Sequence, residues 1–202
     1  MKKQEGLTRI DVAIALACLA LVLAQAAVLN AGGRERAKRE VCLANLRMLT
    51  AAWQMYADDN AGKIVNAAPT TGDPCPGGCS AGPEFMRKAK APTSPTDEHY
   101  KELPWIGPAY GAVSDCSKQC AVNTGALWKY VDDYDIYRCP VGKKGEMITY
   151  VIVDGANGWP RTNTKAAGVW LKSVSQIIKP ASRFVFIDEG YASPDSYAVN
   201  YN

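Results

Sequence analysis

Cysteine is the residue type in this chain with the clearest chemical potential. Six of the seven cysteines follow a long apolar segment, at Cys42, Cys75, Cys79, Cys116, Cys120 and Cys139. An even set on one side of such a segment predicts an oxidising compartment and up to three disulfides. The two Cys-x3-Cys spacings also suggest zinc, but zinc-binding pairs are usually closer in sequence. We therefore expect disulfides, and for Cys139 we favour Cys120 over Cys42 as the partner.

Few other residues could support catalysis or bind a metal. His99 is the only histidine, which excludes histidine-based triads and sites with several histidine ligands. Asp188 and Glu189 adjoin at the end of an expected strand, where they could act as an acid–base pair or bind calcium. No second catalytic set accompanies them, and no phosphate-binding or dinucleotide-binding glycine motif is present. We therefore predict a protein that is not an enzyme, with calcium as the one alternative to having no cofactor.

A third group of residues, at the N-terminus, could direct covalent processing. Behind a leader with two lysines, the chain reads Gly6, Leu7, Thr8, Arg9, Ile10 and Asp11. A secretory signal would instead carry a small-residue cleavage site after the apolar segment. Ala26 and Ala27 do not form a convincing site of that kind. Gly6, followed by Leu7, Thr8 and Asp11, matches instead a glycine cleavage site placed before the apolar segment, and an uncleaved signal anchor stays the alternative.

A long helix is expected to position these residues. Its first part, Val12 to Leu29, contains eighteen residues without a charge, which is roughly 27 Å of helix and long enough to cross a bilayer. Gly32 and Gly33 follow, and each weakens a helix by about 1 kcal/mol relative to alanine, so we predict a hinge there. Lysines and arginines lie on both sides of the apolar segment and do not orient it. The cysteines and the leader favour a cytoplasmic N-terminus.

The second part of the helix is amphipathic. Five apolar residues recur at intervals of 4, 3, 4 and 3, namely Cys42, Leu46, Leu49, Trp53 and Tyr56. This spacing predicts one stripe that packs on a folded domain. Asn60 and Gly62 are the expected left-handed residues that end the helix. From Ile10 to Asn60 an uninterrupted helix would measure roughly 75 Å.

The remaining sequence predicts a small α+β head. Residues 63–122 are rich in proline and glycine, which argues against a long regular element. A short helix is expected over Thr124 to Val131, and Trp105 is expected to cover a small core. Strands are predicted at Met147 to Val153, Gly168 to Leu171 and Arg183 to Ile187. The predicted order is therefore a leader (1–6), a transmembrane and assembly helix (7–31), its amphipathic half (32–61) and an extracytoplasmic head (62–202).

These features resemble the type IV pilin-like family, which includes the pseudopilins of type II secretion and prepilin-like proteins with an N-terminal cleavage and methylation signal. In that family a basic leader and Gly-Phe-Thr-Leu-Ile-Glu precede an apolar helix. Gly6, Thr8 and Ile10 match this pattern, Leu7 and Asp11 are close substitutes, and Arg9 departs from it. Further likeness lies in CLANLRMLTAAWQMYADDNAGKIV, in YRCP at Tyr137 to Pro140 and in FIDEG at Phe186 to Gly190. The resemblance also implies further sequence, with histidines and a closing strand, after Asn202.

The resemblance implies a fold, a processing step and an assembly. The fold is a long helix packed on a small antiparallel sheet of three or four strands, with long disulfide-clamped loops. A prepilin peptidase would cut after Gly6 and methylate the new terminus at Leu7. Asp11, with Thr8 near it, would then act in assembly by meeting a neighbouring subunit's α-amino group. Pairing would offset the cost of an acid at the hydrocarbon edge, up to about 2.5–3.5 kcal/mol.

Two functions remain open from the sequence. The first is a structural subunit of a pilus-like filament or a pseudopilus. This subunit would form a homo-oligomer from the inner membrane, with its head in the periplasm or outside the cell. Its other partners would be the prepilin peptidase and an inner-membrane assembly platform. The second is a membrane-anchored extracytoplasmic binding module that does not polymerise, with Trp105 and the cysteine-rich loops as its ligand surface. The formal charge of only +3 does not favour nucleic acid as a partner.

Overall fold

The structure is a computed structural model that describes residues 9–68, 102–107, 114–158 and 171–190. For Asp11 and residues 22–31 it describes the backbone only. Five residues predicted to have roles lie outside the described ranges, namely Gly6, Leu7, Thr8, Cys75 and Cys79, and so does His99.

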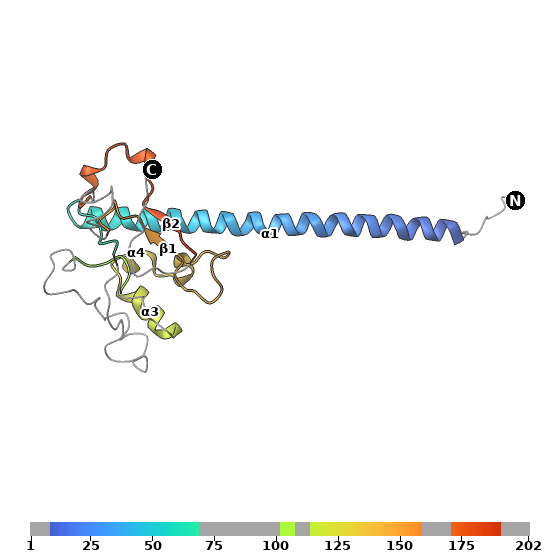
Figure 1. Cartoon of the computed structure of the whole chain (residues 1–202), viewed down its shortest axis with the longest axis horizontal. Helices are drawn as coiled ribbons and strands as arrows, with labels where there is room; N and C mark the ends of the chain where they lie inside the picture. Colours follow the sequence, from blue (N-terminus) through green and yellow to red (C-terminus); the bar gives the residue numbers. More distant parts are fainter. Residues whose placement is uncertain (1–8, 69–101, 108–113, 159–170, 191–202) are drawn as a thin grey trace, which may run out of the picture. The chain divides into compact units, whose positions relative to one another are not determined.

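Helix α1 (Arg9–Asp59) is the longest element, with 51 residues. It appears as one ribbon in Figure 1 and continues through Gly32 and Gly33, so the predicted bend is not a break in the helix. The chain divides into two compact units, Met1–Glu40 and Val41–Asn202. Residues 9–40 of α1 belong to the first unit, and the remainder of the helix belongs to the second.

The end of α1 follows the prediction in part. Gly62 is left-handed at φ +81°, and its N–H donates to the carbonyl of Ala57 over 2.8 Å. The other left-handed residue is Ala61 at φ +55°, and not Asn60 as predicted. Asn60 instead donates its side-chain amide to the carbonyl of Tyr56 over 2.7 Å. Its side chain thereby satisfies one of the carbonyl groups that a helix end leaves unpaired.

The amphipathic stripe predicted on α1 is confirmed. Cys42, Leu49 and Trp53 are buried, and Leu46 and Tyr56 pack against the same core while partly exposed. The core also contains side chains from distant segments, with Trp105, Ile106, Leu127, Tyr137, Ile148, Tyr150, Ile152 and Phe186 among them. Because these segments are short and irregular, this half of α1 is the main regular element against which they pack.

Two helices correct the predictions for the loop-rich region. Helix α3 (Asp115–Thr124) has 10 residues and partly occupies a stretch expected to be loop-rich and without a long regular element. Ser114 caps it, since its hydroxyl oxygen accepts the N–H of Ser117 over 3.1 Å. The helix predicted from Thr124 is shorter, because Gly125 ends α3 and α4 begins later (Trp128–Val131). Single 3-10 turns follow as η2 (Tyr134–Tyr137), η3 (Val174–Gln176) and η4 (Pro180–Ser182).

The described residues contain two strands, β1 (Tyr150–Ile152) and β2 (Phe186–Asp188), which pair antiparallel with Val151 opposite Ile187. Both are shorter than predicted. Next to β1, the Thr149 carbonyl still accepts the N–H groups of Glu189 and Gly190, which follow β2. The Thr149 N–H donates to the carbonyl of Tyr137, and its hydroxyl oxygen accepts the N–H of Cys139. The third predicted strand lies outside the described residues except for Leu171, which is not in a strand.

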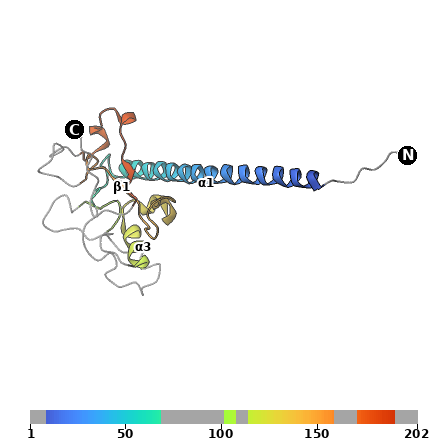
Figure 2. The same cartoon turned by 45° about the vertical axis from the view of Figure 1, so that its right-hand side comes forward.

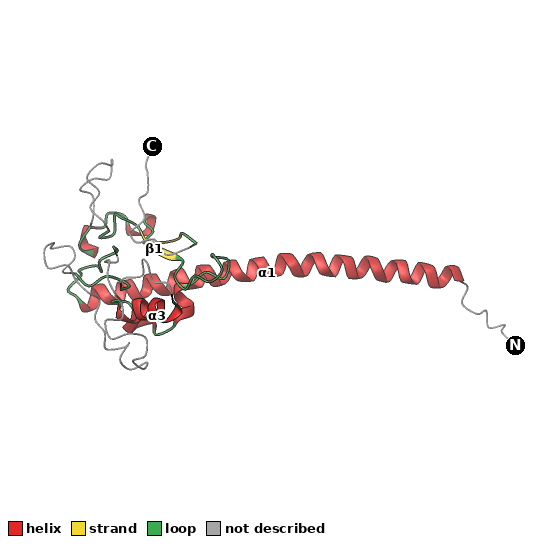
Figure 3. Ribbon diagram, turned by 60° about the horizontal axis from the view of Figure 1, so that its bottom comes forward, coloured by secondary structure: helices red, strands yellow, loops and turns green. Residues whose placement is uncertain are grey.

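The architecture is therefore α+β, with a small antiparallel sheet, as predicted. Figure 2 shows β1 beside the C-terminal part of α1. Figure 3, coloured by secondary structure, shows that loops contribute much of the second unit around this helix.

Candidate functional site

The N-terminal part of α1 carries apolar side chains in every direction. From Val12 to Leu21 each residue is apolar and each is exposed, with Leu16 at 61% and Leu21 at 63%. A helix that is apolar all round is normally buried against other apolar groups. This segment therefore has the composition of a contact surface. Within the part of the chain that the structure describes, no helix is both long and apolar enough to cross a membrane.

The predicted processing and assembly residues lie at or beyond the start of this helix. Arg9 is the first residue of α1, and Asp11 is in its first turn with only its backbone described. Gly32 and Gly33 are exposed within the helix, and a Cβ at either position would have no atom within 4 Å. A bend at these glycines during assembly therefore stays a prediction.

A second exposed apolar surface lies on the other half of α1. Val41, Ala44, Met48, Ala51 and Met55, here called the α1 seam, are all exposed. Val41, Met48 and Met55 are exposed by 46%, 49% and 50%. The spacing of 3, 4, 3 and 4 residues is that of helices packing along a heptad seam, and small alanines allow close approach. The sequence contained this signal, but the stripe that faces the core obscured it.

A disulfide joins α1 to the segment after η2. Cys42 is bonded to Cys139, with 5.0 Å between their Cα atoms, so the preferred pairing of Cys139 with Cys120 was wrong. Asn45 explains why Cys139 lies at α1: its amide donates to the carbonyls of Asp135 and Arg138, over 3.0 and 2.9 Å. Cys116 and Cys120 are also disulfide-bonded, which favours the disulfide interpretation over zinc.

Asp188, one of the two acids proposed for calcium, lies near this disulfide. Among the described residues, one group of three potential ligands is close together: Cys42, Cys139 and Asp188, whose ligand atoms lie within 4.8 Å of one another. The two sulfur atoms are bonded to each other, so they offer no thiolate to a metal. Asp188 ends β2 and accepts the N–H of Gly190 over 3.0 Å.

The C-terminal end of α1 is tied to α4 by a polar cluster. Asp59 accepts hydrogen bonds from Tyr130 over 2.7 Å and from Lys129 over 3.1 Å. The hydrogen bond from Tyr130, followed by that from Lys129, lowers the pKa of Asp59. Because the cluster is exposed and each member is satisfied, it fastens two elements together and leaves no group available for chemistry.

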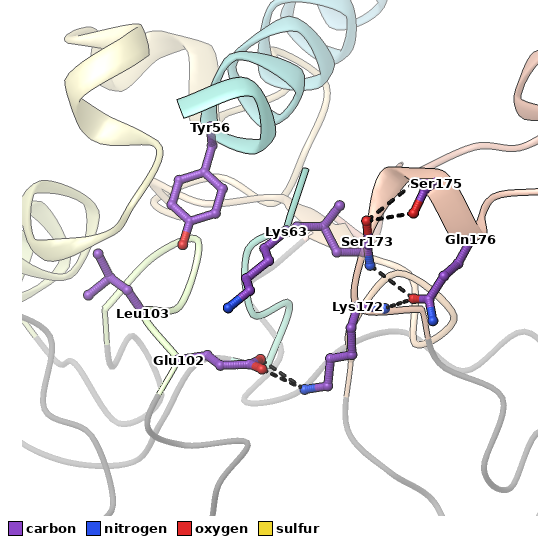
Figure 4. A pocket seen from close by; sticks show the side chains of 9 residues that line it. Tyr56, Lys63, Glu102, Leu103, Lys172, Ser173, Ser175 and Gln176 are labelled. Atoms are coloured by element: carbon purple, nitrogen blue, oxygen red, sulfur yellow. Dashed lines mark hydrogen bonds and ion pairs between the residues drawn. The ribbon is translucent and has the colours of Figure 1, made fainter. Parts of the chain in front are cut away.

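A cleft opens beside the last turn of α1 (Figure 4). It has a volume of about 600 Å³, and its lining comes from four chain segments, with Tyr56, Lys63, Ile64, Glu102, Leu103, Lys172, Ser173, Ser175 and Gln176. Two backbone hydrogen bonds hold the segments together, from Ile64 to Lys172 over 3.0 Å and from Val174 to Gly62 over 2.9 Å. No sequence pattern predicts this site, because its residues converge only through these long-range contacts.

Ion pairing organises one side of the cleft. The Lys172 ammonium lies 2.9 Å from both carboxylate oxygens of Glu102, and the amide of Asn157 donates to one of them over 2.8 Å. Burial raises the pKa of the Tyr56 hydroxyl, and the negative charge of Glu102 raises it further by a smaller amount. Tyr56 therefore stays protonated and remains a hydrogen-bond donor.

Trp105 is not part of any exposed surface. Its side chain is 1% exposed, and its ring lies 5.5 Å from that of Phe186 in an edge-on arrangement. The expectation that Trp105 covers the core is confirmed, and the idea of Trp105 as an exposed ligand-binding aromatic is wrong.

Comparison of the chain with protein-family models, with curated proteins and with solved structures finds no match.

Proposed function

We propose that this protein is a structural subunit of a pilus-like filament or a type II secretion pseudopilus. It inserts in the inner membrane, loses its leader after Gly6 and assembles with copies of itself through α1. The observation that carries the proposal is the all-round apolar and exposed character of α1 from Val12 to Leu21. Burial of each large apolar side chain against a neighbour would contribute about 1.5–3 kcal/mol.

The second half of α1 supports the same proposal. It buries one face in the head and leaves the α1 seam uncovered on another. A helix with two apolar surfaces, one for its own domain and one for a neighbour, suits a subunit that stacks through this helix. The partners are further copies of the chain, the prepilin peptidase, the inner-membrane assembly platform and the membrane. The head lies in the periplasm or outside the cell, an oxidising compartment in which disulfides such as Cys42 to Cys139 persist.

Mass spectrometry of the protein co-expressed with a prepilin peptidase tests the processing step. The expected product begins at Leu7 with a methylated amine. A Gly6→Ala variant retains the leader, while a Gly33→Ala variant, a glycine substitution in an exposed part of α1, is processed normally. An intact Met1 in the unmodified chain, or cleavage after Ala27, would contradict the proposal.

The role of Asp11 is tested separately. An Asp11→Ala variant is expected to insert in the membrane but to lose filaments and crosslinked oligomers, because the acid no longer pairs with a neighbour's terminus. Asp58→Ala, which removes an exposed acid at the other end of α1, is the matched control. Insertion is measured by fractionation, and assembly by electron microscopy and crosslinking.

A membrane-anchored binding module is the second candidate, and the cleft beside Tyr56 favours it. In that case the protein is monomeric in detergent and its behaviour does not depend on Asp11. Loss of oligomers in the Asp11→Ala variant would eliminate this candidate. A monomer in every condition would eliminate the first.

A further inference from the structure

The cleft beside the last turn of α1 offers more hydrogen-bond donors than acceptors. The Lys63 ammonium forms no ion pair or hydrogen bond with any described residue, and Figure 4 shows it extending into the cleft. The hydroxyl of Tyr56 likewise has no partner in the described parts of the chain. The side-chain amide nitrogen of Gln176 contributes two further N–H groups.

The acceptors around the cleft are already engaged. Both oxygens of Glu102 contact Lys172, and one also accepts from Asn157. The side-chain oxygen of Gln176 accepts the backbone N–H groups of Lys172 and Ser173, over 2.7 and 3.0 Å. Among the lining residues that the structure describes, two lysines against one glutamate leave one positive charge in excess, so a ligand would meet donors there.

We propose that this cleft binds a small carboxylate-bearing ligand, with the carboxylate against the Lys63 ammonium. The rest of the ligand lies against the ring of Tyr56 and the side chain of Leu103. A volume of about 600 Å³ is within the range of small-molecule sites. Charge-assisted hydrogen bonds to a carboxylate are about twice as strong as neutral ones, so Lys63 dominates recognition.

The charge balance favours a monocarboxylate over a phosphate group. A phosphate carries up to two negative charges and is usually held by arginine forks or by several backbone N–H groups. The described lining contains no arginine, and one unpaired lysine matches one negative charge.

The ligand site is independent of the proposed function, because neither processing at Gly6 nor contact through α1 uses the cleft. Filaments can form whether or not a carboxylate binds. Failure of one proposal therefore leaves the other standing.

Nuclear magnetic resonance of the methyl-labelled full chain in detergent tests the site. The probes are D-glucuronate and N-acetyl-glutamate α-amide at millimolar concentrations, with D-glucose and N-acetyl-glutamine α-amide as their neutral counterparts. Shifts of the Ile64 and Leu103 methyl signals are expected with an acid and not with its neutral counterpart. The acid that binds more tightly tells whether the carboxylate belongs to a sugar or to a peptide. Absence of acid-specific shifts with both probes would overturn the proposal.

A Lys63→Gln variant is expected to weaken binding of the acid about tenfold, in line with the loss of one charge-assisted hydrogen bond. Lys144→Gln removes an exposed lysine outside the cleft and is expected to leave the affinity unchanged. If Lys63→Gln does not fold, Gln176→Glu is used in its place. The glutamate keeps a side-chain oxygen that accepts the N–H groups of Lys172 and Ser173, and it adds a negative charge to the cleft lining that repels a carboxylate. Equal affinities in the unmodified chain and the cleft variant would also overturn the proposal.

Discussion

Cys42 of α1 is bonded to Cys139, 97 residues later in the chain. This disulfide closes a loop that contains α3, α4 and η2, so it restricts most of the unfolded head. Removing it in a Cys42→Ala/Cys139→Ala variant is expected to lower the free energy of unfolding by about 2–5 kcal/mol. Urea unfolding followed by circular dichroism measures the change. Cys18→Ala, which removes the exposed free cysteine, is the control and should have no effect on the head. A midpoint in the double variant equal to that of the control would contradict the prediction.

Asn45 is expected to be needed for the same junction. It is buried, and its amide satisfies the carbonyls of Asp135 and Arg138. An Asn45→Ala variant should lose about 1–3 kcal/mol of unfolding free energy, because two carbonyl groups lose their donor. The neighbouring exposed residue provides the control, Ala44→Ser, and calorimetry compares the two. Equal stability would mean that water replaces the amide without cost.

Gly125 is expected to tolerate no side chain, for a reason of space. A Cβ there would lie against the carbonyl oxygen of Trp105 and 2.5 Å from the Cα of Ile106. Both contacts are with backbone, so Gly125→Ala should reduce the free energy of unfolding by about 3 kcal/mol. Gly155→Ala adds the same methyl group where no atom lies within 4 Å, and it serves as the matched control in chemical denaturation. Similar effects of the two substitutions would contradict the packing around Gly125.

The α1 seam is expected to act in assembly and not in folding. A Met48→Glu/Ala51→Glu variant places two charges on this surface and should abolish filaments observed by electron microscopy. The free energy of unfolding of the head should change by no more than about 0.5 kcal/mol, because both residues are exposed. Gln54→Glu adds a charge to another exposed position of α1 and should leave filaments intact. Filaments in the seam variant would remove the seam from the interface.

Tyr150 is expected to make the head sensitive to alkaline pH. Burial raises its pKa from 10.0 to about 12, while the hydrogen bond with Asn45 opposes the rise and the charge of Asp188 adds to it. The folded-state pKa is above the unfolded one, so its contribution to stability is full below pH 10 and is lost as the pH rises toward 12. Tyrosinate absorbance and thermal unfolding across this range measure the effect. Tyr150→Phe should reduce the dependence without abolishing it, because burial also raises the pKa of Tyr137, and an unchanged slope would contradict this assignment.

The sequence by itself determined the features that depend on local periodicity. The stripe from Cys42 to Tyr56 was predicted correctly, because helix geometry places residues three and four apart on one face whatever the rest of the chain does. The left-handed Gly62 and the α+β class were predictable for the same kind of reason, from residues close in sequence.

Only the tertiary structure decided which distant residues meet. Cys42 pairs with Cys139 beside the hydrogen bonds of Asn45, and the cleft is formed by segments that contain Tyr56, Glu102 and Lys172. The physical reason is that these contacts join residues far apart in the chain, where many pairings satisfy the same local preferences. Packing around α1 selects one of them, and the sequence alone does not encode that choice in any short pattern.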